Sequence, residues 1–119
     1  MNPIPLITRL ERFSRVLPPL VENLPDEDAR FKPPSGAWSI LEIVCHLGDE
    51  ELEDFRARLR MTLETPGKEW PKIDPEGAAR VRKYNEQDLA KALDRFVRER
   101  SASIEWLRSL RNPDWNLAY

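Results

Sequence analysis

The sequence predicts an all-α fold formed by one small domain over residues 1–119. Apolar residues recur at helical spacing in long stretches, and prolines gather between these stretches. No strand-like alternation, internal repeat or low-complexity segment is present. Apolar residues make up 40% of the chain and charged residues 34%, which is typical of a helix-rich globular protein. With 119 residues, the chain can form one hydrophobic core but not two.

The first helix is expected over about residues 5–24. Pro18 and Pro19 fall inside its pattern, and proline removes a backbone donor and clashes with the preceding turn. We therefore expect a kink or a break near Val16 and Leu17. The apolar positions that share one face at steps of three and four are Leu6, Leu10, Phe13, Leu17, Leu20 and Leu24.

The second helix is expected over about residues 40–63, after a connector rich in proline and glycine. Ser39 and Glu42 have the S-x-x-E spacing of a capping box, in which each side chain hydrogen-bonds the other residue's backbone N–H. Pro66 and Gly67 end the pattern. Its wide apolar stripe, which suits a helix with two neighbours, comprises Ile40, Val44, Leu47, Phe55 and Leu59, broadened by Leu41, Ile43 and Leu52.

A long connection over residues 64–85 precedes the third helix, expected at about 86–110. Asn85 is the expected N-cap, with Asp88 at N3. Arg100 interrupts the apolar face, and we favour a side chain that extends to water over one that reaches a carboxylate on the second helix. The apolar positions of this helix are Leu89, Leu93, Phe96, Val97, Ile104, Leu107 and Leu110.

The composition excludes several classes of protein. A net charge of −2 argues against a surface that binds nucleic acid. No apolar run is long enough to cross a membrane, and the N-terminus does not resemble a signal peptide. The single cysteine, Cys45, cannot form an internal disulfide, which fits a cytoplasmic protein, and we expect it to be a buried thiol.

His46, the only histidine, shares a face of the second helix with Asp49, Glu50 and Glu53, at spacings of three, four and seven. Imidazole and carboxylates together suit zinc, nickel, manganese or iron, so these residues are candidate metal ligands. The alternative is a solvated acidic face whose carboxylates stabilise the histidine. Catalytic sites on zinc usually take three protein ligands and keep one open position, so His46 with flexible carboxylates falls short of that number.

The stretch from Lys32 to Leu47 resembles the DinB/YfiT-like superfamily of metal-dependent hydrolases. The resemblance implies an up-down-down-up four-helix bundle with a divalent metal bound by three histidines, one on the second helix and an H-x-x-x-H pair on the fourth. His46 matches the first of these, and the sequence contains no counterpart to the pair. We therefore expect the fourth helix to be missing or supplied by a partner, and no metal to be bound. The matching elements are Pro33-Pro34, Gly36, Trp38-Ser39-Ile40, Glu42 and His46-Leu47.

A bundle of only three helices would leave an apolar groove open, and soluble monomers rarely expose a large apolar patch. We expect a homodimer that buries this groove by two-fold pairing. The predicted function is a small binding or interaction module with an incomplete metal site. The alternative is a metal-dependent hydrolase or thiol transferase whose site is completed by a partner chain or by a missing C-terminal helix, so enzymatic activity stays open.

Overall fold

The computed structural model describes residues 1–117, and over this range the chain forms helices and turns with no strand. The all-α prediction is therefore confirmed. None of the described helices is long and apolar enough to span a membrane. In chain order the elements are α1 (Ile4–Val21), α2 (Asp26–Arg30), α3 (Ile40–Asp49), the π-helical segment η1 (Glu50–Arg56), α4 (Ala57–Glu64), α5 (Pro75–Val81), the 3₁₀ turn η2 (Tyr84–Glu86) and α6 (Leu89–Ser109).

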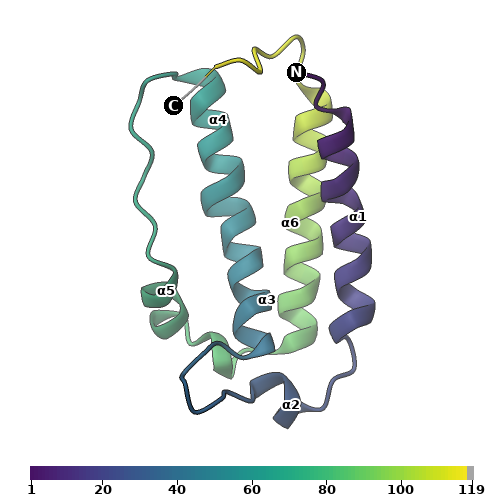
Figure 1. The fold of residues 1–119 in the computed structure, drawn as a ribbon, viewed down its shortest axis with the longest axis vertical. Helices are drawn as coiled ribbons and strands as arrows, with labels where there is room; N and C mark the ends of the chain where they lie inside the picture. Colours follow the sequence, from purple (N-terminus) through teal and green to yellow (C-terminus); the bar gives the residue numbers. More distant parts are fainter. Residues whose placement is uncertain (118–119) are drawn as a thin grey trace.

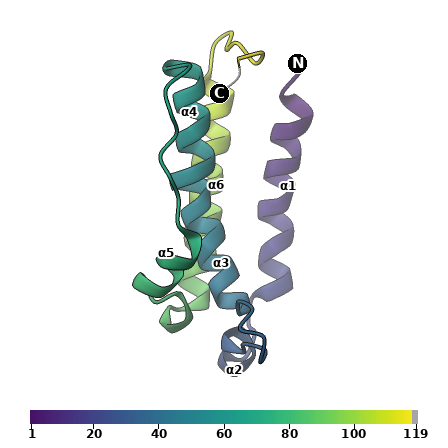
Figure 2. The same cartoon turned by 60° about the vertical axis from the view of Figure 1, so that its left-hand side comes forward.

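Three long rods form an elongated bundle that measures 47 × 29 × 21 Å. One rod is α1, the second is the continuous run α3–η1–α4, and the third is α6 (Figure 1). The connection after α4 returns along the bundle and carries α5, so the second and third rods are parallel to each other and antiparallel to α1 (Figures 1 and 2). Helix α6 packs against both of the other rods.

The predicted capping box at the start of α3 is confirmed. The Ser39 hydroxyl accepts from the Glu42 N–H at 3.1 Å, and the Glu42 carboxylate accepts from the Ser39 N–H at 3.1 Å. The predicted cap of the third rod is wrong, because α6 begins three residues later with Asp88 as N-cap, accepting from the Lys91 N–H. Asn85 instead accepts a 2.5 Å hydrogen bond from the Ser39 hydroxyl and so joins η2 to the start of α3.

The two prolines do not break α1, so of the kink or break expected near Val16 and Leu17, the break does not occur. The helix continues through Pro18 and Pro19 to Val21 (Figure 1). Both prolines lie in the last turn, so the missing backbone donors and the steric conflict affect only the end of the helix. The Glu22 N–H closes that turn on the Pro18 carbonyl at 2.8 Å.

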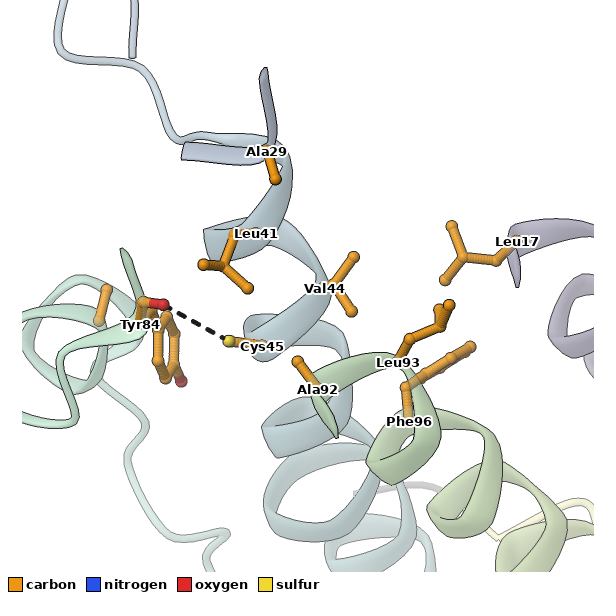
Figure 3. Close-up of a cluster of buried hydrophobic side chains, with 10 residues drawn as sticks. Leu17, Ala29, Leu41, Val44, Cys45, Tyr84, Ala92, Leu93 and Phe96 are labelled. Atoms are coloured by element: carbon orange, nitrogen blue, oxygen red, sulfur yellow. Dashed lines mark hydrogen bonds between the residues drawn. The ribbon is translucent and has the colours of Figure 1, made fainter. Parts of the chain in front are cut away.

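The second rod buries a different part of its apolar stripe from the part predicted. Leu41, Val44 and Cys45 are buried, whereas Ile40 and Ile43 are exposed. Because α6 and the η2 turn cover the rod from one side, they select the buried strip within a stripe that is apolar over a wide arc. The resulting core cluster (Figure 3) consists of Leu17, Ala29, Leu41, Val44, Cys45, Ala79, Tyr84, Ala92, Leu93 and Phe96.

The π-helical turn η1 places a carboxylate inside the bundle. Glu51 is buried, and its Oε1 lies 2.9 Å from Nε of Arg100 on α6. Arg100 also donates to the Leu10 carbonyl at 2.8 Å, and its guanidinium lies over the Phe96 ring. The expectation that Arg100 extends to water is therefore wrong, because the charge has a buried carboxylate partner and a carbonyl acceptor inside the bundle.

We predict that Arg100→Leu lowers the free energy of unfolding by about 3–5 kcal/mol, because it leaves the buried Glu51 carboxylate without its partner. The double variant Glu51→Leu/Arg100→Leu should recover most of this loss, since no buried charge remains. Urea denaturation followed by circular dichroism measures both effects. Arg98→Leu, at an exposed position of α6, is the control. A loss in Arg100→Leu no greater than in this control would contradict the prediction.

Candidate functional site

The candidate site is a pocket of about 460 Å³ between the second rod and the connection that carries α5. The side of α3 and η1 contributes His46, Asp49, Glu50, Glu53 and Asp54. The four residues predicted as a metal shell therefore do line one hollow. The opposite wall is formed by the segment 71–82 and by Tyr84.

His46 is held at the edge of this pocket by two neighbours. Its Nε2 lies 2.8 Å from Oε2 of Glu50, one turn further along. The imidazole meets the Trp38 ring in an edge-to-face contact with centroids 5.0 Å apart. Trp38 also contacts the Tyr84 ring in the same manner, at 6.5 Å. These contacts fix the ring orientation of His46 and use one of its nitrogens for Glu50.

The Asp49 carboxylate accepts hydrogen bonds from three different side chains. Oδ2 accepts from Arg82 Nη1 at 2.6 Å and from the Tyr84 hydroxyl. Oδ1 accepts from Arg95 Nη1 on α6. Burial raises the pKa of Asp49, but the hydrogen bonds from Tyr84, Arg95 and Arg82 outweigh burial and hold the pKa below its usual value. The carboxylate is therefore ionised and saturated with donors at neutral pH.

Glu53 shares the same arginine as Asp49. Arg82 Nη1 lies 2.9 Å and 3.0 Å from the two oxygens of Glu53. The pKa of Arg82 is raised by its hydrogen bonds to Glu53 and Asp49. The four predicted metal ligands therefore form two pairs. His46 lies against Glu50, and Arg82 bridges Asp49 and Glu53.

This arrangement does not fit a metal ion held by the described residues alone. No group of three or more histidine, cysteine, aspartate or glutamate side chains in residues 1–117 is placed to hold one. Two of the four candidate carboxyl and imidazole ligands, Asp49 and Glu53, face a guanidinium, which occupies the electron pairs that a metal would need. The metal-ligand role of His46 remains a prediction.

Sequence reasoning missed the residues that organise the acidic cluster. Arg82, Tyr84 and Arg95 lie 33, 35 and 46 residues from Asp49, so no helical spacing links them to it. One local signal was available in the connection, where Asp74 followed by Pro75 is typical of a helix start. Asp74 indeed caps α5, and this helix brings Arg82 to the pocket.

Cys45 is buried, as predicted, and its side chain does not line the candidate pocket. Its Sγ lies 3.8 Å from the Tyr84 carbonyl (Figure 3) and 3.5 Å from Oε1 of Gln87. Burial, with a smaller contribution from the charge of Asp49, raises the pKa of the thiol to about 11. The sulfur is therefore a neutral core group at neutral pH and not a nucleophile.

A second hollow, of about 440 Å³, lies between α1 and α4 and is almost wholly apolar. Leu6 and Leu10 of α1 face Phe55 and Leu59 of the second rod across it, and Leu107 of α6 contributes to its lining. We call this hollow the apolar groove. Other exposed apolar side chains on the two rods are Phe13, Val16, Leu20, Ile40, Ile43 and Leu52.

Comparison with known proteins identifies relatives of this fold. The model of the DinB superfamily matches residues 9–118. No curated protein matches the chain. Among solved structures, the chain resembles YfiT from Bacillus subtilis, described as a probable metal-dependent hydrolase with an unusual four-helix bundle topology. The two share 20% identity with a TM-score of 0.79 over 89% of this chain, which spans 60% of the YfiT chain. This likeness shows the fold.

We predict that Asp49→Asn lowers the free energy of unfolding at neutral pH. The variant should also lose less of this free energy than the wild type as the pH falls. Because the folded pKa of Asp49 is depressed, its contribution is present above the usual pKa of about 3.9 and is lost as the pH falls through the folded value. Urea denaturation between about pH 7 and pH 3 should therefore show a shallower acid slope in the variant. Asp94→Asn, at an exposed position of α6, should leave the slope unchanged. Equal slopes for wild type and Asp49→Asn would count against the ionised, donor-saturated carboxylate.

Proposed function

This chain belongs to the DinB superfamily, and we propose that it is a small binding and interaction module that works without a metal centre of its own. The observation that carries the proposal is the saturation of Asp49 by Arg82, Arg95 and Tyr84. Releasing Asp49 to a metal would leave Arg82 and Arg95 without this carboxylate partner. His46 then has only Glu50 beside it as an available ligand among the described residues.

The interaction half of the proposal is a homodimer formed through the apolar groove. Leu6, Phe13 and Leu20 of α1 are exposed and follow one another at intervals of seven residues. This spacing repeats along one face of a helix and suits packing against a second helix. A second copy of the chain offers such a helix, and a two-fold contact would bury the groove of each protomer at once.

The alternative function is a divalent-metal-dependent hydrolase or thiol transferase. It is favoured by the half-buried His46 beside Glu50, and by the fold shared with a protein described as a probable metal-dependent hydrolase. In this case residues outside the described chain, for example from a partner, must complete the ligand set, because His46 and Glu50 alone are too few.

Metal content separates the two functions. We predict background levels of zinc, nickel, manganese and iron in protein purified without chelator and without a nickel column. Titration of the wild-type protein with zinc should show no saturable binding heat, and His46→Ala should give the same result. Elemental analysis and titration calorimetry measure these quantities. Stoichiometric metal that is lost in His46→Ala would overturn the proposal and favour the enzyme.

The dimer is tested by charge placed on the exposed seam of α1. We predict that Leu6→Lys/Leu20→Lys converts the protein from two chains to one in sedimentation equilibrium, because it places four lysines along the paired α1 helices. Helical content should stay unchanged, since both side chains project from the fold. Val81→Lys, at an exposed apolar position of α5, is the control and should remain dimeric. A single-chain mass for the wild type would refute the homodimer.

A further inference from the structure

The pocket beside His46 contains two cationic side chains that the acidic cluster does not use. Lys72 and Arg80, on the wall formed by the connection and α5, both line the pocket. Neither side chain has an ion pair or hydrogen bond to any of the described residues. Most of the other charged side chains that line the pocket form ion pairs, so Lys72 and Arg80 are the cationic side chains available to a ligand.

The carboxylates that line the same pocket each have a partner. Asp49 and Glu53 bind Arg82, and Glu50 lies against His46. Asp54 lies 2.5 Å from Arg58, and Asp74 accepts from the Gly77 N–H at 3.0 Å as the cap of α5. Each of these carboxylates therefore already has a donor within the protein. The lining still holds five carboxylates and three cationic side chains, so the donors available to a ligand are local to Lys72, Arg80 and the unused atoms of Arg82.

Arg82 adds further donors to Lys72 and Arg80. Its contacts to Asp49 and Glu53 all involve Nη1, so Nη2 and Nε have no acceptor among residues 1–117. Its side chain is 43% exposed at the pocket. A guanidinium presents donors in a planar fork that matches the oxygens of a carboxylate or phosphate.

We propose that this pocket binds a small organic oxyanion, a carboxylate or a phosphate ester, through Lys72, Arg80 and Arg82. Pro71, Ile73 and Val81 line the same hollow and offer apolar contact to the remainder of such a ligand. A volume of about 460 Å³ is in the range of pockets that hold small molecules. The proposal rests on the proposed function, because it gives the metal-free binding module its class of ligand.

The test is a titration of chelator-treated protein followed by two-dimensional amide NMR. The probes are butyrate for carboxylates, phenyl phosphate for phosphate esters, and butylammonium as the cationic counterpart. We expect at least one of the two anions to give saturable shifts confined to the amides of the residues that line the pocket, among them His46, Tyr84 and the non-proline lining residues of 71–82. Which anion binds more tightly decides between carboxylate and phosphate recognition.

A pair of double variants with the same change in net charge isolates the pocket. Lys72→Gln/Arg80→Gln should weaken binding of the anion by about tenfold or more, whereas Lys91→Gln/Arg98→Gln, both on the exposed face of α6, should not. Equal weakening in the two double variants, binding of butylammonium instead, or no saturable shift with either anion would overturn the proposal.

Failure of this proposal is distinguishable from failure of the proposed function. Loss of anion binding is read from the NMR shifts of metal-free protein, whereas the proposed function fails on stoichiometric metal that depends on His46. An intact anion site in protein that also binds zinc through His46 would overturn the metal-free module while supporting the oxyanion pocket.

Discussion

The Asp49 carboxylate ties together three parts of the chain that are distant in sequence. It ends α3, accepts from Arg82 and Tyr84 at the end of the long connection, and accepts from Arg95 on α6. Because a buried carboxylate is costly without such donors, the connection and α6 must approach the second rod at this point. The same contacts form one wall of the pocket. They also occupy the Asp49 carboxylate, which the sequence suggested as a metal ligand beside His46.

A second buried ion pair works in the same way further along the bundle. Glu51 lies in the π-helical turn, where the wider turn changes the register of the residues that follow, and it meets Arg100 inside the bundle. Neither pair has to add much net stability, since the desolvation of two charges offsets most of their attraction. Because a buried charge without its partner is costly, a register of α6 on the second rod that separates these pairs is disfavoured.

The second rod therefore separates two surfaces with different chemistry. On one side, the pocket beside His46 is lined by charged side chains together with apolar ones such as Ile73 and Val81. On the other, the groove toward α1 is almost wholly apolar. The polar pocket is suited to a small charged ligand and the apolar groove to a helix. This division explains how a chain of 119 residues can combine ligand binding with self-association, as proposed.

The helical class, the sharp start of α3 at the Ser39–Glu42 capping box and the burial of Cys45 could all be predicted from the amino-acid sequence, because each follows from local spacing or from residue type. The sequence also placed His46 and its acidic neighbours on one face. The packing of the helices was needed to show which strip of the second rod is buried, that Arg100 turns inward, and that Asp49 and Glu53 contact Arg82 rather than His46. These outcomes depend on contacts between residues that are 29 or more positions apart, and no helical periodicity encodes such contacts.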